Sequence, residues 1–136
     1  MFTGPLEDRV AIQELNGTYA DGVVRIDADT WATVWAEDAY CDLMGHQTKG
    51  KEAIVAFWKG AMSGLEAVSF HCVPCMIEVS GNTAKSCVQT QEILKPKDGK
   101  ARHVGGLYED TLAKVDGRWL FTSRTFKIIA EFGVEG

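Results

Sequence analysis

His71, Cys72 and Cys75 form a dense group of reactive side chains within SFHCVPCMIEVSG, residues 69–81. A histidine beside Cys-x-x-Cys could bind a metal, belong to a redox dithiol, or act alone as a functional imidazole next to two ordinary thiols. A zinc site needs further ligands at matching spacing, and the other candidates are single residues. A redox pair needs the start of a helix, whereas MIEV after Cys75 alternates like a strand. We therefore predict no metal and two unremarkable thiols.

The side on which His71 projects follows from the two-residue period of a strand. A regular strand places His71 with Val73, Cys75 and Ile77 on an apolar face, and Cys72 on the opposite face. A lone histidine on such a face is ordinarily a core residue that is hydrogen-bonded to a neighbour. The alternative is a general base in an apolar pocket, and the remaining observations favour it.

Arg124 is the second candidate and lies in the last apolar segment, RWLFTSRTFKII. The same period places it with Thr122 and Phe126 on a concave face, and leaves Trp119 and Phe121 on the other face as a candidate partner surface. A buried arginine is costly unless it meets a carboxylate or an anionic ligand. A structural ion pair, with Asp110 or Glu92 as the partner, is the competing interpretation.

Helices and strands that position these residues follow one another in two blocks. Apolar residues at spacings of three and four predict helices over about residues 5–26, after Asp27 or Asp29, and from about residue 51. A strand is expected over residues 36–44. From residue 69 the period becomes two, and four strands are separated by turns, with a bulge at Gly105-Gly106. Helices followed by antiparallel strands indicate an α+β fold with helices on one face of a curved sheet.

Composition limits the possible functions. A chain of 136 residues with a net charge of −5 and scattered basic residues predicts one domain, residues 1–136, that does not bind nucleic acid. The sequence shows neither a membrane-spanning stretch nor a secretory signal, so we expect a cytoplasmic protein with reduced cysteines. It carries no nucleotide or flavin motif, and we expect no cofactor.

Several segments resemble a known family. Tyr-Ala-Asp in the first helix, the Trp-x-x-x-Trp-x-x-Asp that follows, and Gly-Gly-x-Tyr-x-Asp before Val-Asp-Gly-x-Trp are similar to SnoaL-like domains of the nuclear transport factor 2-like superfamily. The resemblance covers about residues 6–129. It implies a cone-shaped α+β barrel, in which a strongly bent mixed sheet and three N-terminal helices enclose a pocket. It also implies a homodimer or a homotrimer.

The dehydratase and dehydrochlorinase branch of that superfamily uses a histidine base, an aspartate that orients it, and an arginine. The resemblance places the histidine at His71 and the arginine at Arg124, but the aspartate position falls on Val24. Tyr19 stands where that branch carries a lysine. No carboxylate then fixes the imidazole tautomer, unless Asp27 returns to the pocket.

We therefore predict a cofactor-independent lyase or isomerase of the dehydratase or cyclase type, acting on a hydrophobic small molecule. His71 is the expected base, Arg124 the group that holds an anion or oxyanion, and Tyr19 a hydrogen-bond donor. The alternative is a non-catalytic binding protein or accessory subunit with the same fold. The predicted substrate-binding residues are Val24, Trp35, Tyr40, Phe57, Trp58, Met62, Cys75 and His103.

Overall fold

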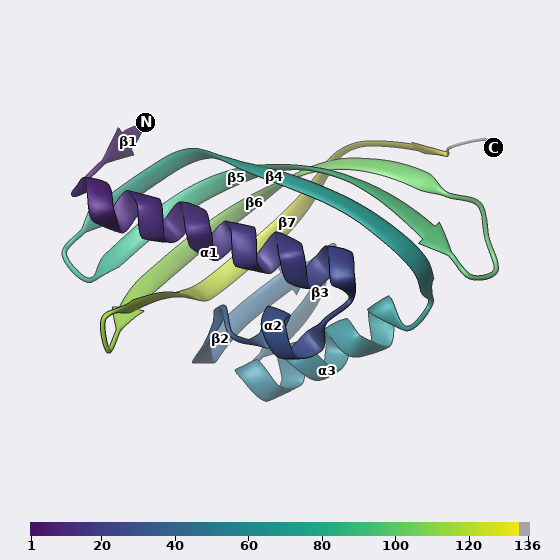
Figure 1. Ribbon diagram of the computed structural model, residues 1–136, viewed down its shortest axis with the longest axis horizontal. Coiled ribbons are helices and arrows are strands. Elements are labelled where there is room, and N and C mark those ends of the chain that lie inside the picture. Colours follow the sequence, from purple (N-terminus) through teal and green to yellow (C-terminus); the bar gives the residue numbers. More distant parts are fainter. Residues whose placement is uncertain (134–136) are drawn as a thin grey trace.

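A computed structural model describes residues 1–133 of the chain. The described residues form three helices and seven strands, with the helices in the first half as the sequence predicts (Figure 1). The helices are α1 (Leu6–Arg25), α2 (Ala28–Ala32) and α3 (Lys51–Met62). The strands are β1 (Phe2–Thr3), β2 (Trp35–Leu43), β3 (His46–Lys49), β4 (Leu65–Ser80), β5 (Thr83–Pro96), β6 (Arg102–Val115) and β7 (Arg118–Gly133).

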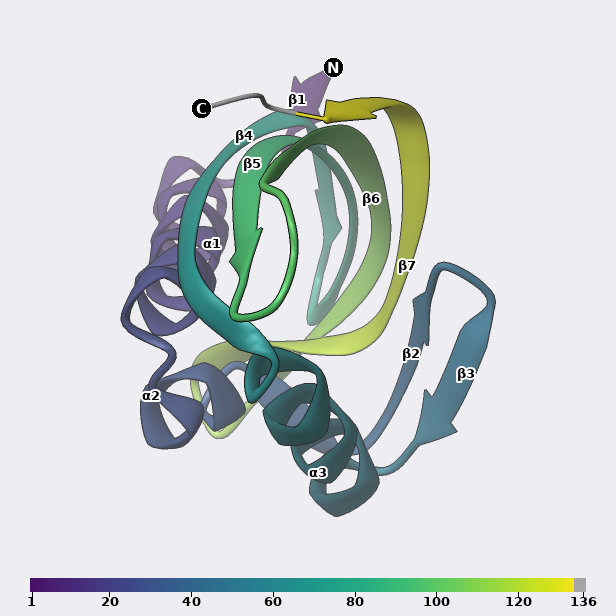
Figure 2. The same ribbon diagram turned by 90° about the vertical axis from the view of Figure 1, so that its right-hand side faces the viewer.

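All seven strands belong to one mixed sheet in the order β1-β4-β5-β6-β7-β2-β3. Strands β4 to β7 form an antiparallel meander, β2 runs parallel to β7, and β1 runs parallel to β4. The sheet is strongly curved when viewed along its length, with α3 at its lower end (Figure 2). The predicted bent mixed sheet with three helices is confirmed.

Helix α1 lies along one face of the sheet and contributes one side of the core (Figure 1). Acidic Glu7 and Asp8 occupy its first turn, where the helix dipole favours negative charge. Its residues Ile12, Tyr19 and Val23 are buried against the sheet. Asp27 accepts a hydrogen bond from the backbone of Thr30 and caps α2, so its carboxylate does not return to a pocket.

Four register shifts interrupt the meander, two between β4 and β5 and two between β6 and β7. In β4 the pairing with β5 shifts between Pro74 and Met76, which leaves Cys75 as an extra residue. In β7 the pairing with β6 skips Thr122, and the predicted shift at Gly105-Gly106 is confirmed. Each extra residue reverses which side of the sheet the following side chains face. A regular two-residue period therefore fails across β4 and β7.

Two strands and one boundary differ from the sequence prediction. Strand β1 is only two residues long, and β3 lies in a segment expected to be a turn. Strand β4 begins at Leu65 rather than at residue 69. Short edge strands carry too few residues to show a period, which explains why the sequence did not indicate them. Within residues 1–133, no helix has the length and apolar character that a membrane crossing requires.

Candidate functional site

An apolar cavity of about 220 Å³ lies between α1, α3 and the inner face of the sheet. We call it the inner pocket. Helices α1 and α3, the end of β2, and strands β4 to β7 all contribute to its walls. The apolar lining residues are Val23, Leu43, Met44, Trp58, Ala61, Met62, Leu65, Val68, Phe70, Leu94 and Phe126. Four polar side chains join them: Tyr19, Glu92, Arg102 and Tyr108.

Tyr19 and Tyr108 share a hydrogen bond of 2.7 Å between their hydroxyl oxygens. Both rings are buried, and burial raises the pKa of each phenol well above its usual value. Both hydroxyls therefore stay protonated at neutral pH. One hydroxyl donates to the other, and the accepting hydroxyl keeps a proton that it can donate to a ligand.

Arg124 lies beneath this tyrosine pair and is fully buried. Its Nε donates to Asp110 Oδ1 at 2.8 Å, while Nη2 donates to Asp110 Oδ2 at 3.0 Å and to Asn16 Oδ1 at 2.6 Å. The guanidinium carbon also lies 4.5 Å from the Tyr19 ring centre and 3.9 Å from that of Tyr108. Burial alone would lower the arginine pKa, but Asp110 more than compensates and raises it. Arg124 therefore stays charged, held by Asp110 and by aromatic rings.

Glu92 brings a carboxyl group into the inner pocket from the middle of the sheet. Burial raises its pKa from 4.5 to about 7, and the positive charge of Arg102 only partly opposes this effect. Arg102 is exposed and pairs with Glu131 at 3.1 Å, so it lies where the pocket opens to solvent. A carboxyl group with a pKa near 7 can accept and return a proton under physiological conditions.

His71 does not face the inner pocket, and the predicted orientation is wrong. Its side chain is exposed on the opposite face of the sheet, like that of Val73, which is 63% exposed. The bulge at Cys75 explains the error. Ile77, beyond the bulge, faces the core, whereas before the bulge Val68 and Phe70 do so. The inward position of Ile77 therefore does not imply that His71, on the other side of the bulge, also faces inward.

Of the other predicted site residues, Tyr19, Trp58 and Met62 line the inner pocket. Val24 is 48% exposed, and its neighbour Val23 takes the pocket position. Trp35 is a core residue that packs between Tyr19 and Phe121. The four remaining predicted residues are half-buried and do not line the pocket. Tyr40 pairs with Lys49 in the β2–β3 hairpin, and Phe57 stacks on His46. Cys75 contacts the backbone of Cys87, and His103 is hydrogen-bonded to Gln91.

Two further expectations for β7 need correction. Trp119 and Phe121 are 4% and 0% exposed, so they belong to the core and not to a partner surface. The bulge at Thr122 places them on the same side as Arg124 and Phe126. Arg124 does not line the pocket; it is fully buried, and its Nε and Nη2 donate to Asp110 and Asn16. The ion pair with Asp110 is the alternative that the sequence left open.

Glu92 and Tyr108 are two polar pocket residues that the sequence analysis did not predict as site residues. In β6, alternation from Val104 through Tyr108 to Leu112 is regular, and all three are buried. The same rule applied to β6 alone would have placed Tyr108 inward. For Glu92 the sequence carries no comparable signal, because a glutamate after Gln89, Thr90 and Gln91 reads as part of a polar segment.

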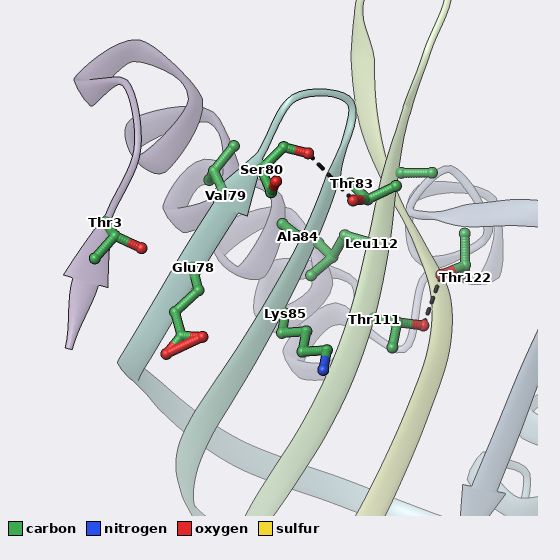
Figure 3. Close-up of a pocket in the computed structure, with 11 residues that line it drawn as sticks. Thr3, Glu78, Val79, Ser80, Thr83, Ala84, Lys85, Thr111, Leu112 and Thr122 are labelled. Atoms are coloured by element: carbon green, nitrogen blue, oxygen red, sulfur yellow. Dashed lines mark hydrogen bonds between the residues drawn. The ribbon is translucent and has the colours of Figure 1, made fainter.

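A larger hollow of about 570 Å³ lies near the β4–β5 turn, and Figure 3 views it with α1 behind the sheet. Glu78 and Lys85 lie on adjacent strands there, and Thr111 bonds to Thr122 at 2.7 Å. Its two charged side chains, Glu78 and Lys85, are exposed to solvent. In residues 1–133, no three His, Cys, Asp or Glu side chains are grouped so as to hold a metal. The inner pocket is therefore the candidate active site.

A bent sheet closed by helices around a pocket with a few inward polar groups defines a cone-shaped, small-molecule-binding type of domain. The model of the SnoaL-like domain matches residues 4–125, and the chain belongs to this family. A search of curated proteins finds no significant match.

Solved structures of the same fold cover nearly the whole chain. A candidate aromatic ring hydroxylase from Novosphingobium aromaticivorans is 27% identical, with a TM-score of 0.89 over 96% of its length and 97% of this chain. A candidate scytalone dehydratase from the same organism is 21% identical, with a TM-score of 0.87 over 90% of its length and 96% of this chain. A type 2 hexachlorocyclohexane dehydrochlorinase is 19% identical, with a TM-score of 0.88 over 91% of its length and 96% of this chain.

Proposed function

We propose that this chain is a cofactor-independent lyase or isomerase that moves a proton on a small apolar ligand in the inner pocket. The observation that carries the proposal is the presence of Glu92, with a pKa of about 7, in the same apolar cavity as the hydroxyls of Tyr19 and Tyr108. A poised carboxyl group and a preorganised hydroxyl pair are the two parts that proton abstraction next to a carbonyl requires. The dehydratase and dehydrochlorinase among the solved structures of this fold agree with this class of reaction.

The roles follow from the protonation states. The Glu92 carboxylate accepts a proton from the carbon next to a ligand carbonyl, and the tyrosine hydroxyl with a free proton donates to the oxygen as negative charge develops there. The proton then returns to another carbon, which is isomerisation, or a leaving group departs, which is elimination. Arg124 stabilises this state from beneath the rings, because its charge lowers the pKa of both tyrosines against the effect of burial.

The size of the inner pocket restricts the substrate. Its volume of about 220 Å³ lies below the ~300–1,000 Å³ of most drug-sized ligand sites. Its walls are aromatic and aliphatic. We therefore propose a hydrophobic substrate of one or two rings that carries a carbonyl or a hydroxyl group.

Hydrogen exchange tests this proposal without knowledge of the natural substrate. The protein is incubated in D2O with a panel of one-ring and two-ring ketones, and NMR follows the loss of the proton signal next to the carbonyl. We expect exchange on at least one ketone, and a rate about 100-fold lower in Glu92→Gln. Glu109→Gln is the matched control, because Glu109 is exposed and pairs with Lys127 on the surface. Exchange that is no faster than in buffer, or equal in wild type and Glu92→Gln, contradicts the proposal.

One observation favours the non-catalytic alternative. The position that carries the base in the resembling branch, His71, is outside the pocket, and Val24 is exposed to solvent. A binding protein would show ligand-induced shifts of pocket resonances with ketones from the panel, but no proton exchange. The same samples therefore distinguish the two functions.

We also propose that the chain forms a homodimer or homotrimer through the outer face of the sheet. Val73, Ile93 and Ile129 are 63%, 42% and 69% exposed on strands β4, β5 and β7. Exposed apolar side chains on several strands of one sheet are a feature of partner surfaces. Light scattering should give a mass two or three times that of the chain, and Val73→Asp should reduce it to the monomer mass. A monomeric wild type would overturn this proposal.

A further inference from the structure

The bulge in β4 places two cysteines opposite each other on the same pair of strands. Met76 pairs with Cys87 of β5, and Cys75 is the extra residue just before it. A bulge of this kind sets two residues of one strand against one residue of the other. Cys75 and Met76 therefore both lie opposite Cys87, although Cys75 and Cys87 are twelve positions apart in the sequence.

The local geometry brings the two thiols into reach of each other. Cys75 Sγ lies 3.4 Å from the carbonyl oxygen of Cys87, and both cysteines are partly exposed free thiols. Residues opposite each other on antiparallel strands have Cα atoms about 4.5–5.5 Å apart, within the ~4.4–6.8 Å that a disulfide spans. Rotation of the side chains, without a change of strand pairing, can then bring the two sulfur atoms together.

We propose that Cys75 and Cys87 form a disulfide when the protein meets a disulfide oxidant such as oxidised glutathione. One thiol loses its proton and attacks glutathione disulfide, which forms a mixed disulfide and releases one reduced glutathione. The second thiolate attacks the protein sulfur of the mixed disulfide and releases the second glutathione. The two protein thiols are oxidised by two electrons, the oxidant is reduced to two thiols, and the two protons go to the released glutathione.

The surroundings of Cys87 disfavour the thiolate form of its side chain. Burial raises the pKa of Cys87, and the neighbouring Cys75 thiol and the carboxylates of Glu109, Asp110 and Glu78 raise it further. Either thiol can make the first attack, and the other then resolves the mixed disulfide. The bond would fasten β4 to β5 next to the segments that carry Phe70 and Glu92 into the inner pocket.

The other two cysteines serve as internal controls. Cys41 is 2% exposed, and burial raises its pKa to about 12. Cys72 lies on the opposite side of β4, where its thiol is 3.6 Å from the Asn16 carbonyl oxygen of α1. Neither is placed opposite another cysteine in the strand register.

Thiol counting with peptide mapping tests the proposal on the full chain. After incubation with oxidised glutathione at about pH 8.5, the free thiols of the unfolded protein should fall from four to two, with the loss of two hydrogen atoms in mass. Cys41→Ser and Cys72→Ser should each still lose two thiols. Cys75→Ser and Cys87→Ser should form no protein disulfide. In the Cys72→Ser variant, a tryptic digest should yield one linked pair, residues 60–85 with residues 86–97.

Oxidation should also raise the thermal midpoint by roughly 5 °C, because the bond closes a short loop in the unfolded chain. Four thiols remaining in the wild type, an intermolecular disulfide on a non-reducing gel, or an intramolecular disulfide in Cys75→Ser would each overturn the proposal. The mapping of the wild-type chain needs no variant, so it stays decisive if a serine variant fails to fold. This outcome is independent of proton exchange in the inner pocket.

Discussion

Replacing Asp110 with alanine is expected to lower the free energy of unfolding by about 3–5 kcal/mol. The substitution leaves Arg124, which has no exposed surface, without its carboxylate partner. It also removes the acceptor of the Ser86 hydroxyl, at 2.9 Å. A buried charge without a partner keeps its desolvation cost and loses the interaction that offsets it. Urea unfolding followed by circular dichroism measures the change.

Asp21→Ala is the matched control, because it breaks an arginine–aspartate pair of the same 2.8 Å length on the surface of α1. Solvent screens that pair, so we expect almost no change in stability. The double variant Asp110→Leu/Arg124→Met should recover part of the loss, since an apolar pair of similar volume carries no buried charge. Equal losses in Asp110→Ala and Asp21→Ala would contradict the interpretation of Arg124 as a paired, structural residue.

The stability of the wild type relative to Glu92→Gln is expected to fall by about 2–3 kcal/mol between pH 4.5 and pH 7.5. The pKa of Glu92 is about 7 in the folded chain against 4.5 ordinarily, and each pKa unit corresponds to about 1.4 kcal/mol. Between these values the folded chain holds a proton that the unfolded chain has released, so stability decreases as pH rises. Above about pH 8 both states are ionised, and the difference becomes constant.

Glutamine is the suitable reference because it copies the shape of the protonated carboxyl group and does not titrate. Denaturant midpoints of the two proteins, measured at the same series of pH values, give the difference directly. Glu66→Gln provides a surface control, because Glu66 is exposed and pairs with Lys95 in solvent. A difference between wild type and Glu92→Gln that is independent of pH would show that Glu92 has an ordinary pKa, and would remove the basis for its role as a base.

The fold could be predicted largely from local patterns. The α1 stripe with Ile12, Tyr19 and Val23 is buried as its spacing indicates, and the Gly105-Gly106 pair does mark a bulge. These features depend on interactions within one helix or one turn, which a single sequence records. Strands β4 to β7 were recognisable for the same reason, since strong turn signals separate them.

The candidate site was less predictable, because its composition depends on where single residues are inserted into strands. The extra residue Cys75 reverses the side taken by His71, and the extra residue Thr122 unites Trp119 and Arg124 on one face. Neither position 75 nor position 122 carries a glycine, the residue that would indicate a bulge in the sequence. Glu92 was missed for a different reason: it lines the cavity beside its cross-strand partner Phe70 and together with α3, and both are distant from it in the sequence.

The extra residue at position 75 also bears on how pockets of this shape can diversify. Deleting that one residue would shift the frame of the preceding half of β4, so that Ser69, His71 and Val73 would exchange places with Val68, Phe70 and Cys72. A single in-frame deletion could thus deliver an imidazole to the cavity without any amino-acid replacement. The two faces of such a strand carry different side chains, and the number of residues in the strand determines which face lines the cavity.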